Sequence, residues 1–167
     1  MATNVPTVRQ VAWISLIPQL ILMGIIIYIY DLQEFDDPFL FGALTYLILS
    51  FGLRNLVARD HRNGMKHVKQ QQFENAIPLF EKSVAFFTKN NWIDKFRFLT
   101  LLSSSKMTYK EMGLCNIAFC YSQISNGQKA KEYYELALKE FPDNGLAAAG
   151  LKMINSFGQT TQTGNKN

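Results

Sequence analysis

An uncharged run of 20 residues near the start of the chain limits what it can fold into. Residues 11–30 read VAWISLIPQLILMGIIIYIY and contain no charged side chain. As a helix, this run covers about 30 Å, the thickness of the hydrocarbon core of a bilayer. A second run, residues 38–56, carries one charge, Arg54, close enough to its end for the side chain to reach the headgroups. The two runs predict two membrane-spanning helices.

The connection between the two runs is too short for anything but a tight turn. Residues 31–37, DLQEFDD, therefore predict an antiparallel hairpin over residues 11–58. A cleaved signal peptide is the alternative for the first run, because it is N-terminal and follows Arg9. Its apolar core is longer than that of a signal peptide, and no cleavage site of small residues follows it. Tyr28 and Tyr30 resemble interfacial anchors, so we expect a retained span.

Charges around the hairpin predict its orientation. The tip contains four acids and no base, whereas bases flank the open end at Arg9, Arg54, Arg59, Arg62, Lys66 and Lys69. By the positive-inside rule, both termini are cytoplasmic and the tip lies on the other side. We favour a plasma or inner membrane over an organelle membrane. Anionic headgroups explain the basic flank, and no nucleic-acid-binding motif is present.

Small and large residues recur at helical spacing behind the hairpin. In residues 111–144, one stripe is followed by a Gly-containing turn and a second stripe, and a proline prevents the second helix from continuing. The small residues allow close helix packing and the tyrosines fill the hollows beside them. The positions are Leu114, Ile117, Ala118, Tyr121, Ala130, Tyr134, Ala137 and Pro142.

This pattern resembles the tetratricopeptide repeat, a 34-residue helix-turn-helix unit. A weaker copy occupies residues 57–90, with Gly64, Ala76, Phe80 and Ser83 at the same intervals and His67 in place of the tyrosine. The resemblance implies an all-α protein in which a two-helix transmembrane hairpin precedes a short α-solenoid. Residues 145–157 resemble the capping helix of such arrays, which closes the helical domain 57–157. We expect a short N-terminal tail, residues 1–10, and a disordered polar tail, residues 158–167.

An insertion, residues 91–110, separates the two copies and is too apolar for a solvated linker. It either adds helix that packs on the repeats or lies on the bilayer surface. In the second case, Trp92, Phe96 and Phe98 enter the interface and Lys95 and Arg97 face phosphate. With Arg54, Arg59 and Lys66, the three aromatic residues form the predicted membrane surface of the chain.

No residue pattern indicates catalysis, a cofactor or a metal. His61 and His67 are six positions apart and do not share a helical face, and no catalytic signature is present. Cys115 and Cys120 have the wrong spacing for a redox or zinc pair, so we interpret them as small buried hydrophobic residues. The chain is predicted not to be an enzyme.

The resemblance implies a concave groove lined by the first helix of each repeat. The groove positions are His61, Arg62, Met65, Lys69, Met112, Cys115, Asn116, Phe119 and Gln123. They combine cations with flexible apolar groups, which suits a peptide or helix with acidic and apolar residues. The alternative is that these residues only pack against neighbouring elements.

Two function classes follow from this organisation. In the first, the hairpin anchors an adaptor whose cytoplasmic repeats recruit a protein partner. In the second, the chain is a structural or assembly subunit of a membrane complex, and the hairpin itself contacts other subunits. A lipid-surface sensor acting through the basic residues and the insertion is a third class.

The predicted topology can be tested with a cysteine placed at Gln33, in a variant that lacks Cys115 and Cys120. Because the acidic tip is expected outside the cytoplasm, a membrane-impermeant thiol reagent should label intact cells. Labelling only after permeabilisation would reverse the predicted orientation.

Overall fold

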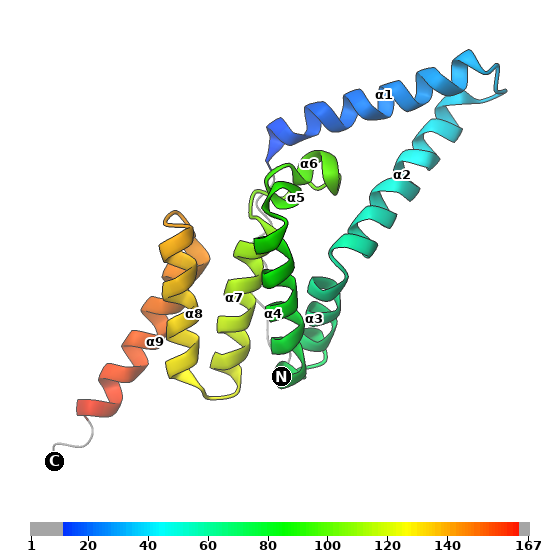
Figure 1. The fold of residues 1–167 in the computed structure, drawn as a ribbon. Coiled ribbons are helices and arrows are strands. Elements are labelled where there is room, and N and C mark those ends of the chain that lie inside the picture. Colours follow the sequence, from blue (N-terminus) through cyan, green and yellow to red (C-terminus); the bar gives the residue numbers. More distant parts are fainter. Residues whose placement is uncertain (1–11, 164–167) are drawn as a thin grey trace. The chain divides into compact units, whose positions relative to one another are not determined.

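The computed structural model describes residues 12–163, with side chains through residue 156. Every regular element in this range is a helix, which confirms the all-α class (Figure 1). The predicted tail 1–10 and residues 164–167 of the predicted C-terminal tail lie outside the described residues. The elements are η1 Trp13–Ser15, α1 Leu16–Leu32, α2 Pro38–Val57, α3 Arg59–Lys69, α4 Phe73–Lys89, α5 Asn91–Lys95, α6 Arg97–Thr100, α7 Tyr109–Gln123, α8 Gly127–Glu140 and α9 Gly145–Thr163.

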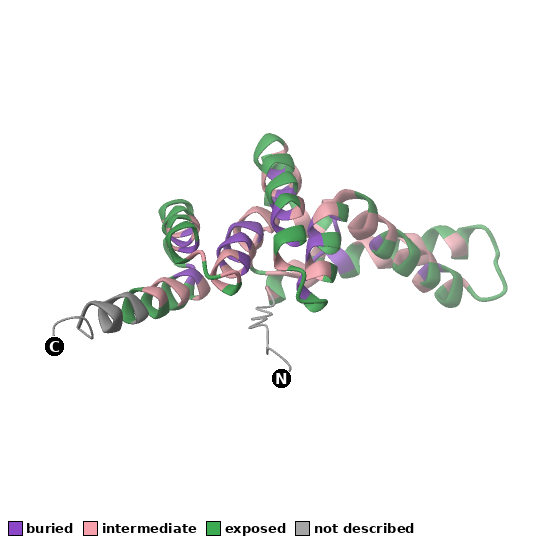
Figure 2. Ribbon diagram, turned by 90° about the horizontal axis from the view of Figure 1, so that it is seen from below, coloured by how far each residue is buried: buried purple, intermediate pink, exposed green. Residues whose placement is uncertain are grey.

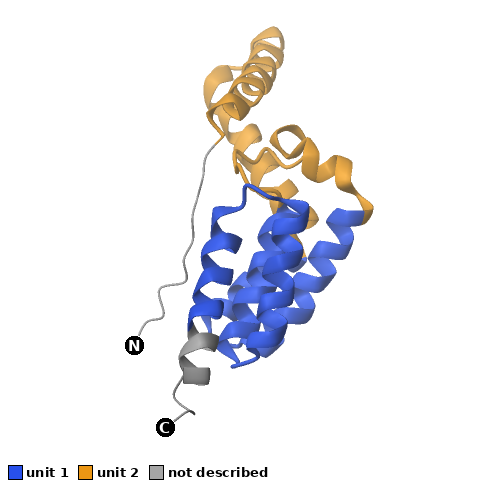
Figure 3. Cartoon of the chain, turned by 90° about the vertical axis from the view of Figure 1, so that its left-hand side faces the viewer, with its two compact units in different colours: residues 1–8, 60–88, 109–167 blue, residues 9–59, 89–108 orange. Residues whose placement is uncertain are grey.

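The described chain divides into two compact units, drawn in different colours in Figure 3. Unit 1 contains Asp60–Thr88 and the chain from Tyr109 onward. Among the described residues, unit 2 contains residues 12–59 and Lys89–Thr108. Unit 2 is thus assembled from two stretches of sequence that the first half of unit 1 separates.

Helices α1 and α2 of unit 2 pack against each other through small and hydroxyl groups. The Tyr30 and Thr45 hydroxyls are 2.9 Å apart. Gly42 lies against Ile27, so closely that an added Cβ would be 2.5 Å from Cγ1 of that side chain. Asp37 begins α2 by accepting a hydrogen bond from the backbone N–H of Leu40, with proline at the first helical position.

Both helices are long and apolar enough to cross a membrane, and they hide little of their apolar surface. Only 6% of the most apolar window is buried in the first helix and 11% in the second. Figure 2 accordingly shows both helices mainly in the colours of exposed and intermediate residues. In this respect they differ from the core helix of a water-soluble protein, which would be mostly buried.

The insertion belongs to unit 2, a different grouping from the predicted helical domain 57–157. Its helical part consists of two short helices, α5 and α6. The backbone N–H of Ala12 donates to the carbonyl of Ser104, and Arg54 donates to the carbonyls of Leu101 and Leu102. These bonds tie the insertion to the beginning of the α1 segment and to the last turn of α2.

Unit 1 buries the residues that carry the repeat pattern. In α7 and α8, Leu114, Ile117, Ala118, Ala130, Tyr134 and Ala137 are all buried. The weaker copy in α3 and α4 does the same with Gly64, Ala76, Phe80 and Ser83. Tyr121 is half-buried, and Pro142 follows the end of α8. The predicted stripes therefore form the core of this unit.

The turn between α7 and α8 differs in detail from the one expected. Ser125, not a glycine, adopts the left-handed conformation, with φ of 62°. Asn126 then caps α8, because its side chain accepts a hydrogen bond from the N–H of Lys129 at 3.2 Å. Gly127 is the first residue of the helix that follows.

The C-terminal helix α9 is longer than the predicted capping helix 145–157. Asn144 caps it by accepting a hydrogen bond from the N–H of Ala147 at 2.8 Å. The helix continues to Thr163, so residues 158–163 are helical and not a disordered tail as predicted. No proline follows Pro142, so nothing removes a backbone donor and stops propagation.

We expect Ala130→Leu to destabilise unit 1, because Ala130 is completely buried and a larger side chain strains its neighbours. The cost should be roughly 1 to 3 kcal/mol. Lys131→Leu is the matched control, since it loses only an exposed pairing with Glu135 at 3.8 Å. Thermal unfolding of the full chain in mild detergent measures both changes, and equal shifts would contradict the helix register.

Candidate functional site

The first helices of the two predicted repeats, α3 and α7, contact each other through side chains of the predicted groove. The amide of Asn116 on α7 lies 3.4 Å from the sulfur of Met65 on α3. Beside this pair, the rings of Phe73 and Phe119 meet edge to face with centroids 5.9 Å apart. The structure therefore brings three predicted residues together and adds Phe73, which sequence reasoning missed.

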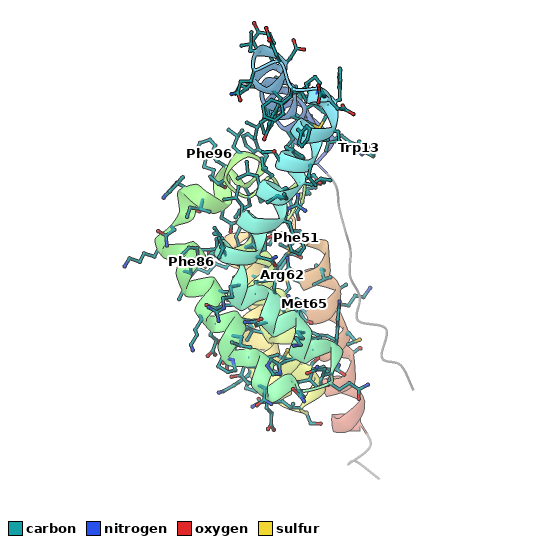
Figure 4. The ribbon with its side chains drawn as sticks, turned by 90° about the vertical axis from the view of Figure 1, so that its right-hand side faces the viewer. Trp13, Phe51, Arg62, Met65, Phe86 and Phe96 are labelled. Atoms are coloured by element: carbon teal, nitrogen blue, oxygen red, sulfur yellow. The ribbon has the colours of Figure 1, made fainter. Side chains whose placement is uncertain are left out.

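The remaining groove residues on α3 and α7 are basic, polar or flexible, and they differ in exposure. Arg62 and Lys69 of α3 and Gln123 of α7 are exposed, and Met112 is half-buried. Figure 4 labels Arg62 and Met65 on α3. We define the candidate surface as Arg62, Met65, Lys69, Phe73, Asn116, Phe119 and Gln123. Its cations attract carboxylates, while Met65 and the two phenylalanines offer adaptable apolar contact.

His61 was predicted to line the groove, but it is buried in the core of unit 1. Its ring packs in edge-to-face geometry against the rings of Phe80 and Tyr109, with ring centroids 5.4 and 5.3 Å apart. Nδ1 has no hydrogen-bond partner among the described residues. Burial lowers the pKa of His61 from 6.5 to about 4, so the ring is neutral at physiological pH.

Cys115, also assigned to the groove, and Cys120 are both buried free thiols. Burial raises the pKa of each to about 12, so neither forms a reactive thiolate at neutral pH. The side-chain amide of Asn144 lies 3.2 Å from the sulfur of Cys115 and thereby links the cap of α9 to α7. Both cysteines have the structural role of buried residues, as we interpreted them from the sequence.

The predicted membrane surface separates into three kinds of side chain. Arg59 and Lys66 are exposed, and so are Trp92 and Phe96. Phe98 is half-buried, and its carbonyl accepts a hydrogen bond from Gln19 at 3.4 Å. Arg54 directs its guanidinium to the carbonyls of Leu101, at 3.1 Å, and Leu102. This last side chain holds two parts of unit 2 together.

Among residues whose side chains the structure describes, no group of three or more His, Cys, Asp or Glu could hold a metal ion. Sequence reasoning missed Phe73 of the candidate surface, and also Tyr109 and Asn144, which contact the buried His61 and Cys115. Phe73 begins α4 and Tyr109 begins α7, each just outside the repeat positions considered. Asn144 follows Pro142 closely, and the Asn before an apolar helix is an N-cap signal that could have identified it.

Comparisons with known protein families, with curated proteins and with solved structures give no match for this chain. The likeness to tetratricopeptide repeats consequently depends on the residue pattern alone.

The buried His61 predicts acid sensitivity. Below pH 6.5 the unfolded chain binds a proton at this side chain, whereas the folded chain does not until the pH approaches 4. Stability is therefore complete above pH 6.5 and falls on acidification, by about 2 kcal/mol between pH 7 and pH 5 from this group. Denaturant unfolding of the full chain in detergent at both pH values measures the loss.

The chain offers a matched control for the same measurement. His61→Phe should remove the contribution of this group, whereas His67→Phe should retain it, because His67 lies outside the core and contacts Gln72 at 2.6 Å. An unchanged pH dependence in His61→Phe would contradict the assignment.

Proposed function

We propose that the chain is an integral membrane adaptor without catalytic activity. In this proposal α1 and α2 cross the bilayer, and unit 1 is a cytoplasmic, tetratricopeptide-like domain that binds a protein partner. The observation that carries the proposal is a contrast within one chain. Unit 1 buries its stripe residues, whereas α1 and α2 leave most of their large apolar side chains exposed.

The packing of the first helix supports a retained span over a removable signal peptide. Gln19, buried in α1, has its side-chain oxygen 3.4 Å from the hydroxyl of Tyr46 and its amide within 3.4 Å of the carbonyl of Phe98. At the tip, Phe35 contacts Tyr30 and Phe41, with ring centroids 5.0 and 5.4 Å apart. Loss of α1 would leave these partners without their contacts.

The candidate surface supports protein binding and indicates the chemistry of the partner. Arg62 and Lys69, both exposed, lie three residues before and four residues after Met65 on α3, and Met65 accepts a contact from the Asn116 amide. A helix or extended peptide with apolar anchors and nearby acids would match both features. A second pair of exposed cations, Arg59 and Lys66, can then contact the anionic headgroups of the bilayer.

One observation favours the second candidate, a subunit of a membrane complex. An added Cβ at Gly24 of α1 or Gly52 of α2 would meet no atom within 4 Å. Small residues on open helix faces allow a further transmembrane helix to approach closely. In this case the hairpin, and not the candidate surface, would determine the partner.

Site-specific photo-crosslinking in native membranes separates the two functions. A benzophenone amino acid at Gln123 tests the candidate surface, and one at Gln128, exposed on α8, is its control. The same probe at Gly24 tests the hairpin. An adaptor should give a discrete adduct from Gln123, whereas adducts from Gly24 alone would favour the complex subunit.

Matched charge reversals then test whether the adduct depends on the proposed chemistry. The double change Arg62→Glu and Lys69→Glu should reduce the Gln123 adduct roughly tenfold, because it repels acids on the partner. The change Arg59→Glu and Lys66→Glu adds the same charge at the same spacing and should leave the adduct in detergent unaltered. Equal loss in both variants would oppose binding at the candidate surface. Replacing the whole hairpin with an unrelated anchor would separate the two functions less clearly, because it would also break the hydrogen bonds between the hairpin and the insertion.

A further inference from the structure

The insertion exposes a row of large apolar side chains that the adaptor proposal leaves unexplained. Trp92 is 62% exposed, Phe96 46% and Leu99 48%. They come from α5, from Phe96 at the junction of the two short helices and from α6. Phe96 projects outward from unit 2 in Figure 4, as does Trp13 at the start of the first apolar helix.

Many backbone carbonyls of the insertion are hydrogen-bonded by side chains, as is required where little water is present. Side chains of the insertion donate hydrogen bonds to several of its own backbone carbonyl groups. Thr100 donates to the carbonyl of Ile93 at 2.7 Å, and Arg97 donates to those of Asp94, at 3.0 Å, Ser105, at 2.9 Å, and Lys106. An unpaired carbonyl costs several kcal/mol in hydrocarbon but little in water, so this degree of pairing favours an apolar site.

Hydrogen bonds between the insertion and the hairpin determine at which point along the hairpin the insertion lies. The insertion contacts Ala12 and Gln19 near the start of the first apolar helix and Arg54 in the last turn of the second. The contacts with Ala12 and Arg54 lie at the open end of the hairpin, away from the tip at residues 33–37, and Gln19 lies about two turns into the first apolar helix. If α1 and α2 cross the bilayer, this open end coincides with the boundary between hydrocarbon and headgroups, where tryptophan side chains concentrate.

From these observations we infer that the insertion is an interfacial element that places Trp92, Phe96 and Leu99 in the boundary layer of one bilayer leaflet. The inference rests on the proposed membrane hairpin. It replaces Phe98, named from the sequence, with Leu99, because Phe98 is the half-buried member of the segment. Arg97 is engaged with carbonyls and does not face phosphate, so the contact with lipid is mainly apolar.

The two tryptophans of the chain allow a direct measurement. Trp13→Phe leaves Trp92 as the only tryptophan, and Trp92→Phe leaves Trp13. Each full-length variant is reconstituted into phosphatidylcholine vesicles that carry bromine either close to the headgroup end of the acyl chains or close to their methyl ends. Bromine quenches only tryptophans near its own depth, so fluorescence reports where each side chain lies.

We expect shallow bromine to quench Trp92 at least about twice as strongly as deep bromine, since interfacial side chains enter only the first 5–10 Å of the apolar region. Raising the salt concentration should not change the result, because the contact is apolar and not a charge attraction. Circular dichroism of both variants checks that they retain the helical fold.

The other outcomes each contradict the inference in a recognisable way. Quenched Trp13 with unquenched Trp92 would show an inserted hairpin whose insertion lies on protein or in water. Stronger quenching of Trp92 by deep bromine would place the insertion in the hydrocarbon core. If neither tryptophan is quenched, the hairpin is not in the bilayer, and the proposed function fails together with the inference.

Discussion

The guanidinium of Arg54 is the only charge between Pro38 and Val57, and its hydrogen bonds with the carbonyls of Leu101 and Leu102 hold unit 2 together. The carbonyls supply acceptors for the cation, and the guanidinium supplies donors for the carbonyls. A cation near an apolar helix is costly without acceptors, and carbonyls beyond the end of α6 are costly without donors. Leu102 takes up a left-handed backbone, with φ of 47°, at this position. This bonding contributes to the grouping of Leu101 and Leu102, 47 and 48 positions later in the sequence, with α2 in unit 2.

Unit 1 is held together by a different principle, the contact of glycine with a large side chain of a neighbouring helix. Gly64 of α3 faces the ring of Phe80 in α4, and an added Cβ would lie 2.8 Å from Cε1. Gly113 of α7 has the same relation to Val84, where the distance would be 2.6 Å. These close approaches bring the helix backbones together and allow Phe80 to be completely buried. The core of the unit therefore depends on the alternation of small and large residues that is visible in the sequence.

The parts of the fold with a strong periodic signal could be predicted from the sequence, and those that depend on long-range bonds could not. Helices α1 and α2 lie close to the predicted spans, and α7 and α8 form the two helices predicted for residues 111–144, because their spacing and the Pro38 and Pro142 boundaries are local signals. The grouping of the insertion depends on long-range hydrogen bonds of Arg54, Ala12 and Gln19, whose partners lie far along the chain. A local signal also misled the prediction for residues 158–163, since polar composition does not by itself stop a helix that has already been initiated.

For the candidate site too, the sequence pattern indicated which helical face a residue occupies but not which residues cover it. The pattern placed Met65 and Asn116 on the first helices of two repeats, and these side chains are in contact. It also placed His61 and Cys115 in the groove, yet both are buried. A helical register assigns a direction to a side chain but not the depth to which neighbours cover it. For His61, the covering residues Phe80 and Tyr109 come from two other helices, one of them beyond the insertion.

The long sequence separation between Arg54 and its acceptors has a consequence for synthesis. Arg54 leaves the ribosome 47 residues before Leu101, which at 5–20 residues per second is a delay of roughly 2–9 s. For that period the last turn of α2 carries a cation whose protein acceptors do not yet exist. Water, or headgroups if α2 crosses a bilayer as we propose, must solvate it in the meantime. The second apolar helix can therefore reach its final hydrogen bonding only after most of the chain has been translated.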